Sequence, residues 1–441
     1  MQKTVTIFGA GLVVKPMVDY LAKQGYNLVI ASRTVSKAEK LAAPHPNATA
    51  KQFVATDEAA MEDYIRKSDL VVSLLPASLH VLVAKKCIAL GKNMVTTSYI
   101  SPQMRALDQQ AKDAGIIILN EIGVDPGIDH MSAMKIFHHV QNNGGKIVSF
   151  MSYCGGLPAL DVNTNPMGYK FSWAPKGVLL AAGNSGRYMR DGETVDVPGK
   201  DLFSHYWLVD VPGVATFEAY INRDSLPYTE LYDLKHVKTM YRGTLRNVGH
   251  CETWFTLSRL GFFDDSVFHD KLEGTVSQFI AEHLLGLDKN ADVETALADK
   301  FGLPAHSVIL KKFGWLGFFD DSPLLIGKGS ACDVLTSIML DRMSYNEGER
   351  DLLAMHHEFV AEFPDKTQNI TSTMVDYGIP DGDSSMSRTV SLPAAIAVRM
   401  ILEGEITVKG VHMPVLPNIY MPVLNELENL GITLIERFND V

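Results

Sequence analysis

Short apolar segments rich in β-branched residues alternate with segments of helical period over the first part of the chain. The alternation predicts strands at residues 4–9, 27–32, 52–55, 69–76, 93–98 and 116–120, which read TVTIFG, NLVIAS, QFVA, DLVVSLLP, NMVTTS and IIILN. Gly25, Gly91 and Gly115 lie just before predicted strands, where helices commonly end. Strands that alternate with helices through short connections predict an α/β fold with a parallel sheet covered on both faces.

The regular alternation of strands and helices ends after Asp125-Pro126. Residues 128–142 have the period of one helix, and IVSFMSYC at 147–154 has the composition of a strand. A polar stretch rich in Gly, Pro and Asn follows to about residue 176. We therefore predict a domain boundary and a binding loop in this region.

The segment from residue 250 to 330 has the strongest helical pattern and contains one internal repeat, LGFFDDS at 260–266 and 316–322. Each copy follows a helical apolar pattern and has a glycine where a helix would stop. We predict two similar helix ends, each with an Asp or Ser cap for the next helix. A calcium or other metal role for the paired aspartates is the alternative.

Two apolar segments lie near the end of the sequence. LPAAIAVRMIL at 392–402 predicts a buried helix, and ITLIERF at 432–438 predicts a last strand. A tail of this kind is able to return to the first sheet and cover or extend it.

Composition narrows the class of protein. The chain has 441 residues, 46% of them hydrophobic, which suits two or three domains with separate cores. The net charge of −11 argues against a nucleic-acid partner, and an anionic substrate would need a local basic pocket. No apolar run reaches the ~18 residues that would span a bilayer.

The four cysteines are far apart and include no C-x-x-C pair, so we expect neither a disulfide framework nor a zinc site; they are Cys87, Cys154, Cys251 and Cys332. This usage favours a reducing, cytoplasmic setting.

The first predicted turn, FGAGLVV, has two of the three glycines of the dinucleotide fingerprint G-x-G-x-x-G. Gly9 is at the position that makes the tight turn, and Gly11 is at the position that lets the backbone approach a pyrophosphate. Val14 replaces the third glycine, which permits close packing of the helix against the strand. Leu12 and Val13 complete the predicted phosphate turn before the helix. The context favours nucleotide binding, and an ordinary strand–helix turn is the alternative.

Cofactor choice depends on the end of the second predicted strand, where an acidic residue would favour NAD(H). This chain has Ser32, Arg33 and Thr34 there, with Lys37 one turn later. Arg33 can pair with a 2′-phosphate, so NADP(H) is favoured over NAD(H). The alternative is that Arg33 is a solvated residue at a helix start.

The segment LLPASLH at 74–80 follows the fourth predicted strand and is expected beside the nicotinamide. Its candidate cofactor contacts are Leu75, Pro76 and His80. The alternative is that Pro76 is only a turn residue and His80 only a helix-surface residue.

A series of longer motifs then appears in one order: TTSYISP, NEIGVDPGIDH, YCGGLPA, GYKFSW, NRDS, RGTLR and MSYNEGERDLLAMHH. With the glycine turn and the SRT segment, they resemble the saccharopine dehydrogenases of the glutamate-forming type, also called saccharopine reductases. The likeness runs over nearly the whole chain. The third fingerprint position is also not glycine in that family, so Val14 is no defect.

The resemblance implies a fold with three parts. These are a Rossmann-type parallel sheet domain from both chain ends, a mixed α/β substrate and dimerisation domain, and a helical insertion. Their expected bounds are 1–127 with 388–441, 128–250 with 330–387, and 251–329.

The resemblance also implies an activity. The family uses NADP(H) to interconvert saccharopine with 2-aminoadipate 6-semialdehyde and L-glutamate. Such a reaction needs an imine, a hydride and three positioned carboxylates, so the protein supplies mainly position and charge. Expected partners are these small molecules and a second copy of the chain, with neither nucleic acid nor membrane.

Substrate contacts are carried over from the motifs. Arg223 in NRDS and Arg246 in RGTLR match family positions that bind substrate carboxylates, and Thr244 and Leu245 belong to the same RGTLR site. The alternative is that both arginines are surface charges.

Family positions that contact saccharopine correspond to Ser98, Tyr99 and Asp125. Those that flank the nicotinamide correspond to Thr97, Val124 and Pro126. Asp125 follows the last strand of the first sheet, where ligands of open α/β sheets bind, so we expect it to be the principal acid/base, with Tyr99 orienting the substrate. The alternative is that both residues only bind the ammonium and carboxylate groups of the substrate.

Cys154, Gly155 and Trp173 fall in the loop that the resemblance expects to close over substrate. Cys154 is expected to be a pocket wall, because hydride transfer to an imine needs no thiolate. His138 and His139 are expected at the surface of an amphipathic helix and lack companion ligands for zinc.

Two other functions compete with this one. The first is a related carbon–nitrogen oxidoreductase for another amino-acid or polyamine aldehyde, and the second is a non-catalytic NADP-binding relative. Arg223 and Arg246 favour a polycarboxylate substrate over a polyamine.

Overall fold

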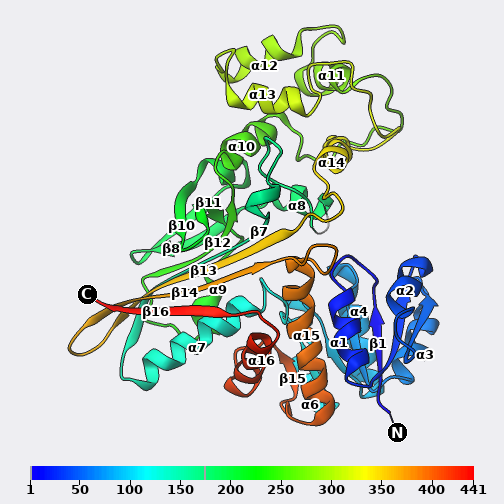
Figure 1. Ribbon diagram of the computed structural model, residues 1–441, viewed down its shortest axis with the longest axis vertical. Helices are drawn as coiled ribbons and strands as arrows, with labels where there is room; N and C mark the ends of the chain where they lie inside the picture. Colours follow the sequence, from blue (N-terminus) through cyan, green and yellow to red (C-terminus); the bar gives the residue numbers. More distant parts are fainter. Residues whose placement is uncertain (1, 173–174) are drawn as a thin grey trace. The chain divides into compact units, whose positions relative to one another are not determined.

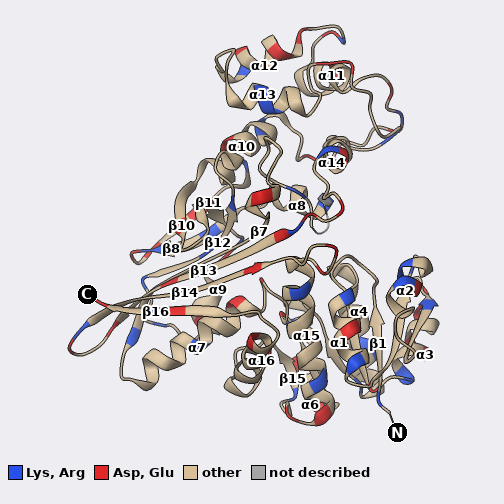
Figure 2. Ribbon diagram, in the orientation of Figure 1, with Lys and Arg blue, Asp and Glu red and all other residues tan. Residues whose placement is uncertain are grey.

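The computed structural model describes residues 2–172 and 175–441 and divides into two units. The first unit consists of Met1–Lys146, Phe363–Lys366 and Met374–Phe438. The second consists of Ile147–Glu362, Thr367–Thr373 and Asn439–Val441. Figure 1 shows the elements of each unit, and Figure 2 shows basic and acidic residues interspersed along both.

The first unit contains a sheet of seven strands. They are β1 (Thr4–Phe8), β2 (Asn27–Ser32), β3 (Ala48–Gln52), β4 (Leu70–Ser73), β5 (Asn93–Val95), β6 (Ile117–Leu119) and β15 (Gly410–His412). Their order is β15-β6-β5-β4-β1-β2-β3, and every neighbouring pair is parallel. This is the doubly wound order of a dinucleotide-binding sheet, with one strand added at the β6 edge. The predicted parallel sheet is confirmed.

Nine helices belong to the described part of this unit. They are α1 (Lys15–Lys23), α2 (Val35–Ala42), α3 (Glu58–Arg66), α4 (His80–Leu90), α5 (Pro102–Arg105), α6 (Asp108–Asp113), α7 (Ile128–Asn142), α15 (Ser385–Glu403) and α16 (Pro417–Asn429), with the short 3₁₀ turn η1 (Ala77–Leu79) before α4. The prediction of one helix over 128–142 is confirmed by α7. Helix α15 packs against both α1 and α16.

The third strand was predicted at 52–55, and this prediction is wrong. The strand is β3 at Ala48–Gln52, an edge strand whose side chains are mostly exposed. Phe53 follows the strand and is 3% exposed, because its ring packs 4.8 Å from the ring of Phe8. The apolar segment at residues 52–55 therefore marks a side chain, Phe53, that packs into the core directly after the strand.

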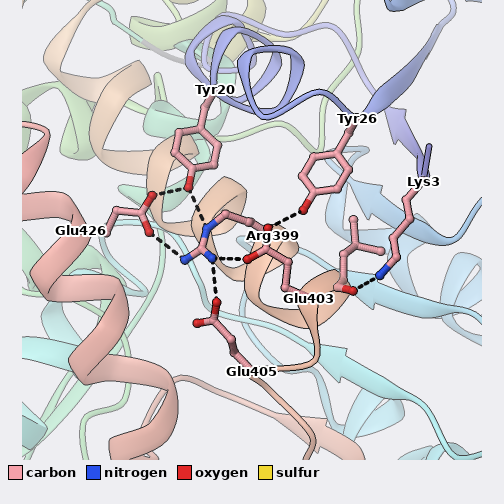
Figure 3. Close-up of polar contacts among 8 residues, drawn as sticks. Lys3, Tyr20, Tyr26, Arg399, Glu403, Glu405 and Glu426 are labelled. Carbon is pink, nitrogen blue, oxygen red and sulfur yellow. Dashed lines mark hydrogen bonds and ion pairs between the residues drawn. The ribbon is translucent and has the colours of Figure 1, made fainter. Parts of the chain in front are cut away.

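A charged cluster joins the last helices of the first unit to its first helix (Figure 3). The guanidinium of Arg399 on α15 lies 2.7 Å from Glu405 and 2.9 Å from Glu426 of α16. Its Nε donates to the hydroxyl of Tyr20 on α1 at 3.2 Å. Both ends of the chain therefore build this unit, as the sequence predicted.

A second sheet has nine strands, which lie mostly in the second unit. They are β7 (Lys146–Pro158), β8 (Gly186–Arg190), β9 (Glu193–Val197), β10 (Tyr206–Val211), β11 (Ala215–Ile221), β12 (Thr239–Arg246), β13 (Asp351–Glu362), β14 (Thr367–Tyr377) and β16 (Leu434–Asp440). Seven follow the order β10-β11-β12-β7-β13-β14-β16, while β8 pairs with β12 and β9. The last strand therefore extends this sheet, whereas the first sheet is extended by β15.

Helices connect these strands. They are η2 (Leu160–Val162), α8 (Pro175–Ala181), η3 (Gly199–Ser204), α9 (Pro227–Leu231), α10 (His250–Leu260), α11 (Val276–Phe279), η4 (Ile280–Leu285), α12 (Val293–Phe301), α13 (Val308–Trp315) and α14 (Ala331–Arg342). The expected helical character of residues 250–330 is confirmed.

The two LGFFDDS copies end helices α10 and α13, as predicted. Gly261 and Gly317 have φ angles of +101° and +81°, which suit a glycine at a helix end. The predicted caps are wrong, because Asp264 accepts from the backbone N–H of Ser266 two residues later, at 2.8 Å. The next helices, α11 and α14, are capped by other residues that precede them directly.

Candidate active site

The turn after β1 requires a glycine at its first position. Gly9 has a φ of +119°, and a Cβ atom there would lie 2.7 Å from the carbonyl oxygen of Leu74. Its N–H donates to the carbonyl of Ala31 at 2.9 Å, so the turn is held between β2 and the segment after β4. No larger residue fits without moving the backbone.

The next positions leave room for a ligand. A Cβ atom on Gly11 would meet nothing within 4 Å, and the side chain of Leu12 is 69% exposed. Val13 is half-buried, and its carbonyl accepts a hydrogen bond from the hydroxyl of Ser391 on α15. Val14 is 1% exposed, so it fills the helix–strand packing for which the fingerprint usually has glycine. The turn therefore keeps an open backbone at the start of α1, which fits a pyrophosphate.

Basic residues stand at the start of α2, directly after β2. Ser32 ends the strand and accepts from the N–H of Thr34 at 3.3 Å. Arg33 and Lys37 are exposed and form no ion pair with any residue that the structure describes. The absence of a carboxylate partner fits a site for a 2′-phosphate.

His80 begins helix α4 and is buried, so the alternative of a helix-surface residue is wrong. It is 3% exposed, with Nδ1 2.9 Å from the hydroxyl of Ser73 and Nε2 2.8 Å from that of Ser98. Burial lowers the pKa of His80 to about 4. The imidazole is therefore neutral at pH 7 and joins the end of β4 to the segment after β5, whereas Leu75 and Pro76 are more accessible.

The segment after β5 and the turn after β6 meet through two predicted site residues. The hydroxyl of Tyr99 donates to Oδ1 of Asp125 at 3.1 Å, and both side chains are half-buried. Thr97 and Ser98 precede Tyr99 and are also partly accessible, while Val124 and Pro126 on either side of Asp125 are buried. The structure therefore brings together the residue predicted as the acid/base, Asp125, and the residue predicted to orient the substrate, Tyr99.

Arg246 is a buried cation in the second unit. Its side chain is 6% exposed, and the guanidinium lies 4.9 Å from the centre of the Tyr169 ring. Nη1 donates to the carbonyl of Leu245 at 3.0 Å, and the buried Nε has no hydrogen-bond partner among the described residues. No carboxylate within the described ranges forms an ion pair with Arg246, and a buried guanidinium without an anion is unfavourable.

The nearest carboxylate on the neighbouring strand is used elsewhere. Glu218 on β11 lies opposite Arg246 on β12. Its two oxygens accept from the N–H groups of Gly249 and Cys251, each at 2.7 Å, at the start of α10. This cap was missed from the sequence, because Glu218 lies far from α10 along the chain.

Arg223 has a different environment. It is exposed and has a φ of +62°, which is uncommon for a residue with a side chain. Its carbonyl accepts from the N–H of Arg187 at 2.9 Å. Thr244 and Leu245 lie on β12 before Arg246, with Leu245 buried.

Cys154 and Gly155 were predicted in a loop, and this placement is wrong. Both belong to β7, where Cys154 pairs with Thr244 of β12. A Cβ atom on Gly155 would lie 2.6 Å from the carbonyl oxygen of Leu245, so glycine permits the close approach of the two strands. The prediction for Trp173 concerns a residue outside the described ranges.

His138 was expected at the surface, but it is half-buried on α7, with Nδ1 2.6 Å from the Tyr420 hydroxyl on α16. His139 is exposed, as expected. All four cysteines are buried, and none is joined in a disulfide.

Across residues 2–172 and 175–441, no group of three His, Cys, Asp or Glu side chains is placed to hold a metal ion. In the same part of the chain, no helix combines the length and apolar character needed to span a bilayer.

Family models match almost the whole chain. Residues 5–119 match the saccharopine dehydrogenase NADP binding domain, and residues 123–432 match the saccharopine dehydrogenase C-terminal domain. The chain belongs to the saccharopine dehydrogenase family.

Curated members of the saccharopine dehydrogenase family align over the full length. The saccharopine dehydrogenases [NADP(+), L-glutamate-forming] of Pyricularia oryzae and Schizosaccharomyces pombe are each 38% identical to this chain, over 99% of both sequences. The solved apo structure of the L-Glu-forming saccharopine dehydrogenase from Saccharomyces cerevisiae has a TM-score of 0.89 and 37% identity, covering 99% of this chain and 100% of that one.

These matches confirm three predictions from the sequence: the saccharopine dehydrogenase family, the α/β fold class and NADP as the cofactor. The NADP-binding match spans the glycine turn and the basic start of α2, which are the features that fit the cofactor. The roles given to single residues remain predictions.

Proposed function

We propose that the protein is an NADP(H)-dependent oxidoreductase that interconverts saccharopine with 2-aminoadipate 6-semialdehyde and L-glutamate. The observation that carries the proposal is the buried guanidinium of Arg246, which has no carboxylate partner among the described residues. In a saccharopine dehydrogenase, a substrate carboxylate is the anion that such a cation would bind.

The cofactor is assigned to the first unit. The open backbone at Gly9, Gly11, Leu12 and Val13 would hold the pyrophosphate at the start of α1. Ser32, Arg33, Thr34 and Lys37 would hold the 2′-phosphate. Leu75, Pro76, Thr97, Val124 and Pro126 would lie beside the nicotinamide, which supplies or accepts the hydride when bound.

Arginines of the second unit would bind substrate carboxylates. Arg246 offers its unpartnered Nε from a buried position, and Arg223 offers a solvent-accessible side chain. Thr244 and Leu245 would line the site beside Arg246. Cys154 and Gly155 would contribute walls, and Cys154 would not be a nucleophile, since the chemistry requires no thiolate.

Proton transfer is assigned to the first unit. Making or breaking the imine between the aldehyde and the glutamate amine moves protons between amine, carbinolamine and water. Asp125 is the proposed acid/base. Tyr99, whose hydroxyl donates to Asp125 at 3.1 Å, would orient the substrate beside it. Ser98, whose hydroxyl contacts His80, would contact the substrate directly.

Three broader features belong to the same proposal. We propose a cytoplasmic enzyme that acts as a homodimer. We also propose that the chain consists of a dinucleotide domain, a substrate and dimerisation domain, and a helical insertion over residues 251–329.

A direct assay tests the activity. Purified protein is mixed with saccharopine and either NADP or NAD, and reduction is followed at the nicotinamide absorbance band. We expect turnover with NADP. Turnover with another amino-acid or polyamine adduct, but none with saccharopine, would indicate the related oxidoreductase, and NADP binding without turnover on any adduct would indicate a non-catalytic relative.

A further inference from the structure

Three buried ionisable residues of the first unit form a connected chain of contacts. Glu121 is 4% exposed, Asp129 is 2% exposed and His130 is fully buried. His130 Nε2 lies 2.9 Å from Oε2 of Glu121, and Nδ1 lies 3.7 Å from Oδ2 of Asp129. The first contact has the length of a hydrogen bond, and the second is longer than a hydrogen bond. None of the three residues was assigned a role from the sequence.

One end of this chain holds the segment that carries Tyr99. Oε1 of Glu121 accepts from the N–H of Ile100 at 2.8 Å, and the N–H of Glu121 donates to the carbonyl of Ser98 at 3.1 Å. Glu121 therefore contacts the backbone on both sides of Tyr99. It does so with a φ of +55°, a strained conformation that persists only where the surrounding structure requires it.

The other end holds the turn that carries Asp125. Oδ1 of Asp129 accepts from the N–H of Gly127 at 2.6 Å, and the N–H of Asp129 donates to the carbonyl of Val124 at 3.1 Å. A Cβ atom on Gly127 would lie 2.0 Å from the carbonyl oxygen of Gly123, so the turn is tightly packed. Asp129 thus contacts the backbone on both sides of Asp125.

We propose that Glu121, His130 and Asp129 are positioning residues, which set the separation of Tyr99 and Asp125 without touching the substrate. His130 joins the two carboxylates, so the two backbone segments are held in one geometry. The inference rests on the proposed acid/base role of Asp125. Its consequence is that a change at His130 acts on turnover through Asp125, even though His130 is fully buried.

The size of the effect follows from geometry. The Tyr99–Asp125 hydrogen bond is 3.1 Å long, so a further separation of about 1 Å would break it. A displacement of about 1 Å at a reacting group can cost ~100-fold in rate. Most of the proposed binding contacts, among them Arg246 and the phosphate turn at Gly9 and Gly11, lie outside the two segments that Glu121 and Asp129 contact. A positioning role therefore predicts a large effect on kcat and a small effect on KM.

The test compares two histidines of helix α7. His130→Leu removes the contact with Glu121, and His138→Leu, the matched control, removes the contact with Tyr420 at 2.6 Å. We expect His130→Leu to lower kcat by about 10- to 100-fold with KM for saccharopine within about threefold. His138→Leu should lower the melting temperature but leave kcat within about twofold of wild type. His130→Gln, which keeps a donor toward Glu121, should recover most of the loss.

A double variant separates positioning from general damage. In the Asp125→Asn background, His130→Leu should lower kcat no further, because the residue it positions is already disabled. A further fall as large as in wild type, or equal losses of kcat in the His130→Leu and His138→Leu proteins, would overturn the inference.

A crystal structure of a further variant tests the inference without relying on the proposed chemistry. It also serves if the His130→Leu protein does not fold. Asp129→Ala leaves the Glu121–His130 pair intact and removes the contact with Gly127. In its crystal structure we expect the Tyr99–Asp125 separation to exceed the present 3.1 Å and break the hydrogen bond. An unchanged separation refutes the positioning role, whereas wild-type kcat in Asp125→Asn alone refutes only the acid/base role.

Discussion

Arg246 lies opposite Glu218 across the β11–β12 pairing, yet the two side chains form no ion pair. The glutamate caps helix α10, so the buried guanidinium has no carboxylate partner among the described residues, and we expect it to bind a substrate carboxylate. Replacing it by Arg246→Met should leave the free energy of unfolding unchanged or raise it by ~1 to 4 kcal/mol, because a desolvated charge is removed.

The same Arg246→Met variant should raise KM for saccharopine by about 100-fold, since a charge-assisted contact is lost. Urea unfolding, steady-state kinetics and NADPH titration measure the three quantities, and the NADPH Kd should not change. Arg187→Met, which removes an exposed pair with Asp196, is the control. A stability loss in Arg246→Met with an unchanged KM would assign the arginine a purely structural role.

The two glycines of the nucleotide turn should respond differently to alanine. Gly9→Ala brings a Cβ atom to 2.7 Å from Leu74 and adds strain at a positive φ, so the free energy of unfolding should fall by ~1 to 3 kcal/mol. Gly11→Ala meets nothing within 4 Å, so stability should stay within about 0.5 kcal/mol of wild type.

The methyl group added at Gly11 should affect cofactor binding and not stability. We expect the NADPH Kd of Gly11→Ala to rise at least ~10-fold, because the pyrophosphate approaches the backbone there. Fluorescence titration of NADPH gives the value. Unchanged NADPH binding in a folded Gly11→Ala protein would place the pyrophosphate elsewhere.

Cofactor choice should depend on Arg33. Arg33→Ala removes an exposed guanidinium without a protein ion-pair partner in the described part of the chain. The NADPH Kd should rise by about 10- to 100-fold, corresponding to ~1.5 to 3 kcal/mol for a charged hydrogen bond, while the NADH Kd stays constant. Lys40→Ala, on helix α2 directly after Arg33 and Thr34, is the control for a general loss of positive charge. Equal affinities for NADPH and NADH in wild type would contradict this prediction.

Asp125→Asn keeps the shape of the side chain but cannot exchange a proton. Turnover at saturating substrate should fall by about 10²- to 10⁴-fold and lose one limb of its pH dependence. Asp63→Asn, at an exposed pair with Lys67, should behave as wild type. If Asp125→Asn raises only KM across the pH range, Asp125 binds the substrate without moving a proton.

His80 should make stability depend on pH. Its pKa is about 4 in the folded protein because of burial, and about 6.5 in an unfolded chain. Below pH 6.5 the unfolded chain therefore binds a proton that the folded protein does not, and stability falls as the pH drops toward 4. The loss should reach about 3 kcal/mol relative to the His80→Gln variant. Urea unfolding of both proteins between pH 7 and 4.5 measures it, and parallel curves would show that His80 titrates normally when folded.

Local patterns predicted much of the fold. Helix α7 begins and ends at the residues expected from its apolar period, and Gly9 and Gly11 occupy the turn that the fingerprint requires. These features depend on neighbours along the chain. Strand β3 was misplaced because Phe53 is apolar for packing against Phe8 and not for strand pairing.

Contacts between distant segments could not be predicted in the same way. The ring nitrogens of buried His80 lie 2.9 Å and 2.8 Å from the hydroxyls of Ser73 and Ser98, which belong to two other segments. A histidine at a helix start has the same local sequence pattern whether it is buried or exposed. The contact between Glu121 and His130 likewise depends on the tertiary arrangement. So does the lack of a carboxylate partner for Arg246 among the described residues.

The assembly of the first sheet has a consequence for synthesis on the ribosome. Strand β6 ends at Leu119, whereas its neighbour β15 begins at Gly410, and helix α1 packs against α15 from the same late segment. At about 5 to 20 residues per second, the missing pieces emerge roughly 15 to 60 s later. For that interval the nascent nucleotide-binding unit has an open sheet edge and an uncovered helix face. We therefore expect it to be protease-sensitive and a client of ribosome-associated chaperones until the last strands are translated.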